Sequence, residues 1–465
     1  MGTATATDLR TLLHAAADHA AAHLEADADA PVRAPRTAAD LIQAFEAPLP
    51  EDGADAAAVL EELVAMAAPG ITRMTSPRFF GFVVGGSLPA ALAADWMAAA
   101  WDNNAGLAEP TPAVAAAEQV AGEWLKQLLG LPSAASFALV TGCQMAHATA
   151  LAAGRHRVLA DAGWDVERDG LAGAPRIRVL AGAERHVTVD RALRLLGLGT
   201  ACVEPVEVDA RGAMRADALA AALRAGGGAG GPLIVCAQAG NVNTGAVDPL
   251  RAIIEIARKH GAWTHVDGAF GLWANAAPER RALLDGVEDA DSWATDGHKW
   301  LNVPYDCGMA FVADAAAHRA AMTVTAAYLV QHEGGPREPV DFTPEFSRRA
   351  RGVAVWAALR SLGRAGVAEM VERTCACAER FAAALAAEPG VEVLAQELNQ
   401  VLVRATAGDA ATDALVSGLQ AEGTCYPTGT TWRGRRCMRI SVSNWQTTPH
   451  DVDRSLAAMR SLLAS

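Results

Sequence analysis

From residue 137 onward, short apolar runs alternate with longer stretches of helical character, and this alternation limits the possible folds more than any other feature. Repeated strand-helix units favour a mostly parallel sheet that is covered by helices on both faces. The sequence therefore predicts an α/β domain as the main body of the chain. Strands are expected at 137–140, 177–180, 202–208, 233–237, 263–266, 293–295 and 308–312, and helices at 145–155, 189–196, 215–224, 249–260 and 279–284.

The segments on either side of this body have a different character. Residues 1–87 contain two helical stretches, 8–25 and 54–68, and neither has an obvious core of its own, so we expect them to pack onto another surface. The helix at 112–129 has a Thr111 N-cap, a first-turn proline and a closing Gly130. We divide the chain into an N-terminal helical arm (1–87), a large domain (88–359) and a small α/β domain (360–465). The small domain should hold helices at 366–387, 412–421 and 450–463 and strands at 391–394, 400–405 and 438–443, after a helix at 351–362.

One lysine, Lys299, follows a buried strand and directly follows a histidine, His298. A lysine in apolar β surroundings is costly unless its charge is paired or removed. Schiff-base formation with an aldehyde cofactor removes the charge and gives the amine a function. The alternative is a lysine at a strand end whose amine reaches solvent.

Two further polar residues stand at the ends of expected strands. Asp267 ends an apolar run and is followed by small residues, so it could pair with a protonated pyridine nitrogen or cap the next helix. His186 lies at a strand-to-helix junction, where it could stack on an aromatic cofactor or cap a turn. A turn that begins at Thr141 opens a helix, and amides at a helix start favour a phosphate group.

These pieces and their order resemble the pyridoxal-phosphate decarboxylases of the aromatic-amino-acid and glutamate decarboxylase group. The resemblance covers about residues 70 to 460 and rests on six ordered blocks. They are Ser76-Pro77-Arg78-Phe79-Phe80, Leu139-Val140-Thr141-Gly142, Gly240-Asn241-Val242-Asn243-Thr244-Gly245-Ala246, His265-Val266-Asp267, His298-Lys299-Trp300 and Cys437-Met438-Arg439-Ile440-Ser441.

The resemblance implies a fold type I enzyme, similar to aspartate aminotransferase, that uses pyridoxal 5'-phosphate to release carbon dioxide from an L-amino acid. It implies that Lys299 binds the cofactor covalently, that Asp267 keeps the ring nitrogen protonated and that His186 stacks on the ring. It also implies a homodimer, with the N-terminal arm lying across a second subunit. The cofactor-binding set that it implies is Thr141, Gly142, Cys143, Gln144, His186, Gln238, Asp267, Ala269, Asp296, His298 and Lys299.

The chain departs from this group at two places near the chemistry. Asp296 stands where the group commonly has a neutral polar side chain near the phosphate. The group also carries a loop tyrosine that returns a proton to the α-carbon, and here Phe342 occupies the matching region, as in related aldehyde synthases. Two outcomes stay open: another donor, with Tyr305 first, gives the amine, or oxidative deamination gives an aldehyde. Other fold type I reactions, such as transamination, and a non-catalytic scaffold are further alternatives.

The substrate side chain is the least determined feature. The resemblance places Phe82 and Val83 near it, while Asn103 and Asn104 replace the apolar residues of a dopa-type site. Phe342 completes the tentative substrate set, and Trp101, Phe82 and Trp273 could still hold an aromatic ring.

Charge and cysteine usage narrow the remaining classes. The net charge of −14 and the lack of a basic cluster argue against nucleic acid as a partner. No apolar run is long enough to cross a membrane, and the N-terminus does not resemble a signal peptide. The eight cysteines have no zinc-finger spacing, so we expect reduced thiols, no metal and a cytoplasmic protein.

Overall fold

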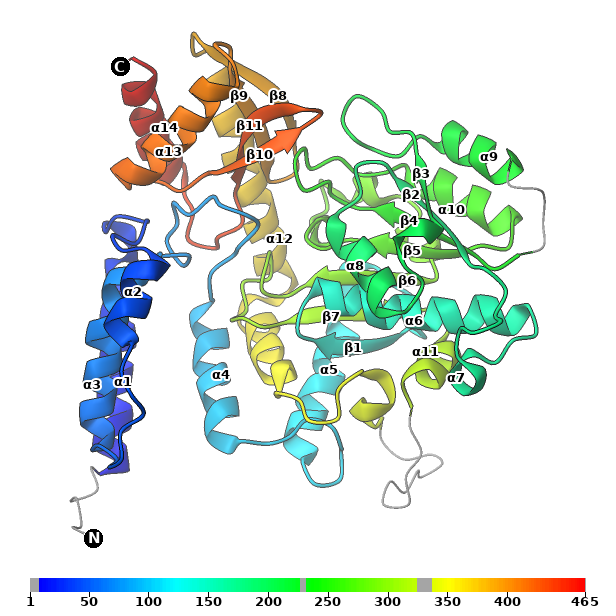
Figure 1. Ribbon diagram of the computed structural model, residues 1–465, viewed down its shortest axis with the longest axis horizontal. Coiled ribbons are helices and arrows are strands. Elements are labelled where there is room, and N and C mark those ends of the chain that lie inside the picture. Colours follow the sequence, from blue (N-terminus) through cyan, green and yellow to red (C-terminus); the bar gives the residue numbers. More distant parts are fainter. Residues whose placement is uncertain (1–7, 226–230, 324–336, 465) are drawn as a thin grey trace.

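The computed structural model of the chain describes residues 8–225, 231–323 and 337–464. Its main body is a seven-stranded sheet with the order β1-β7-β6-β5-β4-β2-β3 (Figure 1). The strands are β1 (Ser136–Val140), β2 (Arg178–Gly182), β3 (Val203–Val206), β4 (Leu233–Gln238), β5 (Trp263–Asp267), β6 (Ser292–Asp296) and β7 (Gly308–Val312). All seven expected strands of this body are therefore present.

The sheet is mostly parallel, as the alternation predicts, and β7 is the exception. It runs antiparallel to both β6 and β1, while the remaining pairs are parallel. A parallel neighbour needs a crossover, whereas an antiparallel one can follow a shorter loop. The chain therefore returns from β6 to β7 through residues 297–307, and this loop carries Lys299 across the carboxyl end of β6.

Two apolar layers cover the sheet. On one face α6 (Cys143–Asp161) lies along the strands, with α8 (Val187–Leu195), α11 (Ala315–Met322) and the short α7 (Val166–Asp169) beside it (Figure 1). The opposite layer includes α5 (Pro112–Leu129), α9 (Ala216–Ala225), α10 (Leu250–Lys259) and the 3-10 helices η4 (Gly271–Ala276), η5 (Arg281–Leu284) and η6 (Val287–Asp289). The polar residues considered below lie where β4, β5 and β6 end against α6.

The small domain is a four-stranded antiparallel sheet in the order β10-β11-β9-β8. A helical segment, α12 (Arg351–Ala386), joins it to the large domain and runs across the expected boundary at residue 360. Gly363 inside it is not helical, with a φ of 60° and a ψ of −179°, so α12 consists of two helices that meet at a kink. The two helices expected at 351–362 and 366–387 are therefore confirmed. The other elements are β8 (Val391–Glu397), β9 (Gln400–Ala405), α13 (Asp409–Glu422), β10 (Thr428–Trp432), β11 (Arg435–Ser441) and α14 (Pro449–Leu463).

The N-terminal arm stands beside α4 (Pro89–Trp101) at the left of Figure 1. It consists of α1 (Leu9–Glu25), α2 (Ala38–Phe45) and α3 (Ala56–Ala67), and none of these three helices contains a buried residue. The two short turns η1 (Ala26–Ala28) and η2 (Ala68–Gly70) lead from the arm to the body. The arm thus lacks a core of its own, as its sequence predicts.

Several local expectations need correction. The helix expected at 279–284 is only the 3-10 turn η5, and four elements were not predicted: α2, α7, α11 and β10. Thr111 occupies the N-cap position of α5, but its hydroxyl donates to the carbonyls of Leu107 and Asn104 instead of capping the helix. The glycine-rich loop at 226–231 and Tyr328 fall wholly or mostly outside the described residues.

Two chain-wide expectations can be compared with the structure. All eight cysteines are unpaired and buried, so they are core thiols. Within the described ranges, no helix combines the length and the apolar character that a membrane crossing requires.

Candidate active site

Lys299 lies in the loop after β6 and forms an ion pair with the strand's last residue. Its Nζ is 3.1 Å from Asp296 Oδ2, and the lysine side chain keeps 21 % exposure. Burial by itself would lower the pKa of the Lys299 amine, but the Asp296 carboxylate reverses this effect and raises the pKa above its ordinary value. The lysine therefore points into the protein and pairs with an acid, which differs from the solvent-reaching alternative.

Asp296 is the centre of a second set of contacts at the start of α6. Its Oδ1 accepts a hydrogen bond from the amide of Cys143 at 2.6 Å and lies 3.4 Å from His298 Nε2. An acidic side chain therefore stands at the helix start where we expected a phosphate group. The positive N-terminus of α6 and the Lys299 amine offset the negative charge of Asp296, and His298 lies beside it.

The turn before α6 packs directly against β7. A Cβ on Gly308 of β7 would lie 2.3 Å from the carbonyl carbon of Gly142, so this close approach of two backbones requires glycine at position 308. Around this turn, Thr141 is exposed, Gln144 is half-buried and Cys143 is buried. Burial raises the pKa of the Cys143 thiol, and the nearby Asp296 adds to that effect, which keeps it protonated.

Asp267 ends β5, in register with Gln238 of β4 and Ala294 of β6. Its Oδ1 accepts from the amide of Ala269 at 3.2 Å and lies 3.5 Å from His147 Nε2. Burial by itself would raise the pKa of this carboxyl, but His147, His186 and Lys299 outweigh this effect and hold the pKa below its ordinary range. Asp267 is thus a buried, ionised carboxylate. It makes a local turn with the Ala269 amide but does not cap the next helix, η4, whose N-cap residue is Phe270.

Three more of the expected cofactor residues surround Asp267. His186 is the N-cap residue of α8, where its Nδ1 is 2.8 Å from the Thr188 hydroxyl, so it does cap a helix. Burial lowers the pKa of His186, which keeps its ring neutral. The buried side chain of Gln238 accepts a hydrogen bond from the Asn241 side chain. The carbonyl of Ala269 accepts a hydrogen bond from the Asp296 amide.

The expected substrate residues are divided between two settings. Val83 is buried, whereas Phe82 is 55 % exposed and has a φ of 53°. Trp101, at the end of α4, is also exposed. Trp273 does not fit the ring-binding role suggested for it, because its side chain is fully buried and its Nε1 donates to the Asp296 carbonyl.

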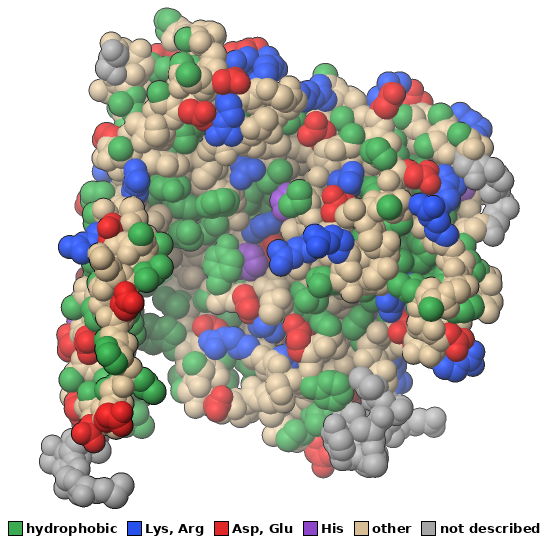
Figure 2. Space-filling view, viewed as in Figure 1, with side chains coloured by type: hydrophobic (Ala, Val, Ile, Leu, Met, Phe, Trp, Pro, Cys, Tyr) green, Lys and Arg blue, Asp and Glu red, His purple; other side chains and the backbone are tan. Residues whose placement is uncertain are grey.

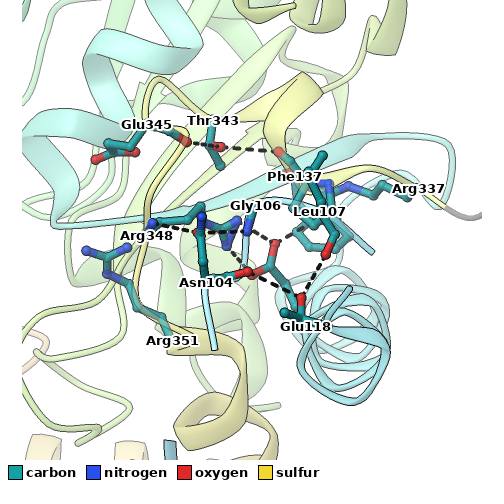
Figure 3. Close-up of polar contacts among 12 residues, drawn as sticks. Asn104, Gly106, Leu107, Glu118, Phe137, Arg337, Thr343, Glu345, Arg348 and Arg351 are labelled. Atoms are coloured by element: carbon teal, nitrogen blue, oxygen red, sulfur yellow. Dashed lines mark hydrogen bonds and ion pairs between the residues drawn. The ribbon is translucent and has the colours of Figure 1, made fainter. Parts of the chain in front are cut away.

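The side chain of Asn104 is engaged with backbone amides. Its Oδ1 accepts from the amides of Gly106 and Arg348, as Figure 3 shows, and Asn103 donates to the Trp101 carbonyl. Asn104 belongs to a buried cluster in which Glu118 of α5 binds both Arg348 and Arg337 (Figure 3). This cluster fastens the segment after residue 336 to α5.

Phe342 packs in the 3-10 helix η7 (Pro339–Phe342) against its own chain. Its ring makes an edge contact with His318, with centroids 5.3 Å apart, and the Arg337 guanidinium lies 4.7 Å from its centroid. Of the two tyrosines in the described ranges, Tyr426 stacks on Phe79. Tyr305 instead stacks on His298, with ring centroids 4.2 Å apart, and so lies beside Lys299.

The sequence analysis missed the role of two residues, Arg439 and His147. Arg439 of β11 is buried, its Nη1 donates to the Val242 carbonyl, and no carboxylate of the described chain forms an ion pair with it. Burial lowers the pKa of Arg439 to about 10, and its charge in turn contributes to lowering the pKa of His186. The sequence did contain a signal for Arg439, because it is a single cation within the apolar run of Cys437, Met438 and Ile440.

Between the arm and the body, the face seen in Figure 2 is hollowed, with histidine and basic side chains at its floor. Asp267 at the end of β5 offers a buried carboxylate and Lys299 in the loop after β6 offers an amine. Arg439 of β11 adds a buried guanidinium whose charge acts on His186 in the same region. Such a set can bind an aldehyde, a basic ring nitrogen and a carboxylate.

Comparison with known proteins shows which family has this arrangement. The model of the pyridoxal-dependent decarboxylase conserved domain matches residues 39–405. The chain belongs to this family. Tryptophan decarboxylase 1 of Oryza sativa subsp. japonica is 30 % identical over 96 % of this chain and 92 % of the relative. Phenylacetaldehyde synthase of Petunia hybrida is 27 % identical over 70 % of this chain and 66 % of the relative. The crystal structure of Oryza sativa TDC with PLP and tryptamine has a TM-score of 0.92 at 28 % identity, covering 100 % of this chain and 99 % of that one.

As a member of the pyridoxal-dependent decarboxylase family, the protein is an enzyme that decarboxylates an amino acid with pyridoxal phosphate. The described residues fit this cofactor at three points: the Lys299 amine, the buried Asp267 carboxylate and the His186 ring. The fit differs at the phosphate, because Asp296 already uses the Cys143 amide. The remaining amides at the start of α6 and His298 are the groups left for the phosphate.

Proposed function

We propose that the protein converts an aromatic L-amino acid to its amine and carbon dioxide, as a cytoplasmic homodimer with active sites at the subunit interface. The observation that carries this proposal is the set of the Lys299 amine, the buried Asp267 carboxylate and the buried Arg439 guanidinium, whose charge acts on the neighbouring His186. The exposed rings of Phe82 and Trp101 are available for an aromatic substrate. The names of the relatives support an aromatic side chain. Eight unpaired thiols support a reducing compartment.

In this proposal the cofactor is held at the floor of the large domain. The Lys299 amine binds it covalently, Asp267 pairs with its ring nitrogen, and His186 lies against its face. Pyridoxal phosphate, when bound, supplies an electron sink for the carbon that loses carbon dioxide. Asp296 forms an ion pair with the Lys299 amine in this structure, and this pair orients the amine and balances its positive charge.

Arg439 binds the carboxylate of the substrate. A buried guanidinium without an acidic partner is costly, and a carboxylate ligand would compensate its charge. Arg439 reaches the region from the small domain, and its charge acts on His186. The large and small domains (88–359 and 360–465) would thus hold the two ends of the substrate between them.

Tyr305 returns the proton to the α-carbon. Its ring stacks on His298, and burial raises the pKa of its phenol, so the hydroxyl carries a proton at neutral pH. Phe342 has no hydroxyl and packs against His318. An oxidative route to an aldehyde remains a second candidate, favoured by this phenylalanine and by the similarity to an aldehyde synthase.

The test is product analysis with twenty L-amino acids, each with and without dioxygen. We expect carbon dioxide and amine in equal amounts from an aromatic substrate, and no need for a keto-acid acceptor. Tyr305→Phe should lower amine formation by about a hundredfold, the usual contribution of a general acid. Aldehyde, ammonia and peroxide as the main products would establish the oxidative route. Strict dependence on a keto acid, with no gas released, would contradict decarboxylation.

A further inference from the structure

A row of buried polar side chains extends from Asp267 away from the site. His147 Nε2 is 3.5 Å from Asp267 Oδ1, and His147 Nδ1 is 2.9 Å from His265 Nε2. His265 Nδ1 is 2.9 Å from Ser292 Oγ, which also accepts from Trp263 Nε1 at 2.9 Å. All five side chains are buried, with at most 5 % of any residue exposed. Water therefore cannot substitute for a missing partner along this chain.

The chemistry of the two ends gives this chain a direction. An ionised carboxylate has no hydrogen to donate, so electrostatics favours a hydrogen on His147 Nε2, which lies 3.5 Å from Asp267 Oδ1. Neutral His147 then accepts at Nδ1 from His265 Nε2–H, and neutral His265 accepts at Nδ1 from the Ser292 hydroxyl. The Ser292 oxygen keeps a lone pair for Trp263, whose indole can only donate. Every polar hydrogen then has an acceptor.

The reverse direction requires Cys143 as its donor. Cys143 Sγ lies 3.4 Å from His147 Nε2 and could donate to it, which would move the hydrogen of His147 to Nδ1. A bare lone pair of His147 would then face the Asp267 carboxylate, and the Ser292 hydrogen would lose its acceptor. A thiol is a weak donor, whereas an N–H that faces an ionised carboxylate 3.5 Å away is favoured electrostatically over a bare lone pair. The forward direction is therefore favoured.

Both histidines are suited to the neutral state that this direction needs. Burial lowers the pKa of His147, and burial together with the neighbouring His147 lowers the pKa of His265 to about 3. A neutral His147 leaves the full negative charge on Asp267. The Asp267 carboxylate is then oriented by the Ala269 amide and by the His147 N–H that faces it, and it can still pair with a cation on its other side.

We propose that Trp263, Ser292, His265 and His147 form a one-way hydrogen-bond relay that orients Asp267 toward the ring nitrogen of the cofactor, with His147 as a positioning residue. This proposal rests on the proposed role of Asp267. The relay itself is a property of the protein without its cofactor, so its direction can be measured separately.

The first measurement uses the cofactor-free protein labelled with ¹⁵N in histidine, after dialysis against a chelator. Chelation is needed because Cys143 Sγ, His147 Nε2 and an Asp267 oxygen lie within 4.8 Å of one another, so a scavenged metal would also fix His147. NMR should show both His147 and His265 as neutral Nε2–H tautomers, assigned by loss of their signals in His147→Gln and His265→Gln. An Nδ1–H tautomer or an imidazolium at either position would overturn the relay.

The second measurement is the affinity for pyridoxal phosphate. His147→Leu should weaken binding by about tenfold or more, in the range seen when a supporting residue behind a ligand is removed. His147→Gln, which keeps a donor near the Nε2 position, should recover most of the affinity. His318→Leu is the control, because His318 is equally buried and bonded to a serine, Ser136, on another strand. Unchanged affinity in His147→Leu, or an equal loss in His318→Leu, would overturn the positioning role. Wild-type protein that binds no pyridoxal phosphate would instead contradict the proposed function and leave the tautomer result standing.

Discussion

The floor of the large domain and the N-terminal arm are built on opposite principles. At the floor, Asp267 and the residues behind it are buried, and their polar atoms pair with one another. In the arm, α1, α2 and α3 contain no buried residue, although many of their side chains are apolar. The most exposed of these are Leu9, Leu13, Ile42, Phe45, Val59 and Leu63.

The two regions differ in whether a single chain supplies their packing and hydrogen-bond partners. The polar side chains at the floor find these partners within one chain. Helices as short as those of the arm are marginal in water without tertiary packing, and so many exposed apolar side chains mark an interaction surface. We therefore expect cofactor binding to depend on the floor and subunit association to depend on the arm, with independent readouts.

Replacing Lys299 should have the largest effect and should leave the arm untouched. Lys299→Ala is expected to reduce decarboxylation to background and to abolish covalent attachment of the cofactor, while the protein keeps its native mass in solution. The sequence has only three lysines, so attachment can be located by borohydride reduction and peptide mass analysis. Lys259→Ala, at the exposed end of α10, is the control and should keep both properties. Modification of another lysine in the wild-type protein would contradict the assignment.

Charges on the arm should give the converse result. Phe45→Asp with Leu63→Asp removes two exposed apolar side chains from α2 and α3. Burying such a side chain contributes about 1.5–3 kcal/mol, so the pair should weaken a dimer by at least about a hundredfold. Light scattering should show half the wild-type mass, with loss of activity but retained cofactor colour. Ala457→Asp, on the exposed side of α14, is the control. A variant that keeps both mass and activity would show that the arm is an appendage.

The contrast between these regions also describes what the sequence could predict. Cap and breaker residues placed α5 well, because Pro112 and Gly130 act locally. The arm was foreseen as a region without its own core. By contrast, α2 and β10 were missed. The capping box of Thr37 and Asp40 was a readable start signal for α2, whereas the short stretch Thr428–Trp432 of β10 has no comparable local signal. The two halves of α12 were placed as separate helices, and Gly363 does interrupt the helical backbone between them.

The same limit applies to the site. Asp267, His298 and Lys299 stood out because a charged residue at the end of an apolar run is unusual. His147 looked like an ordinary histidine in an alanine-rich helix, and its partner His265 is 118 residues away in the sequence. Only the fold brings them together. The tertiary partner of Asn104, the Arg348 amide, likewise could not be foreseen from the residues around it.

Replacing Arg439 should have the smallest effect on activity. Because Arg439 belongs neither to the floor nor to the arm, its replacement should separate substrate binding from both cofactor binding and subunit association. Arg439 reaches the site from β11 in the small domain, so its loss should change neither mass nor cofactor colour. Removing a hydrogen bond to a charged group costs about 1.5–3 kcal/mol, so Arg439→Gln should raise KM for the amino acid by about tenfold to a hundredfold. Arg436→Gln is the control, since Arg436 lies on the same strand but pairs with Asp413 at the surface.

The product amine makes this measurement specific, because it lacks the carboxylate that Arg439 is proposed to bind. Inhibition by the amine should therefore be the same in Arg439→Gln and in the wild type, while KM for the amino acid rises. If both affinities fall together, the arginine supports the shape of the pocket and does not bind the carboxylate. If neither changes, the buried charge is compensated by backbone carbonyls such as that of Val242, and the substrate carboxylate must bind elsewhere.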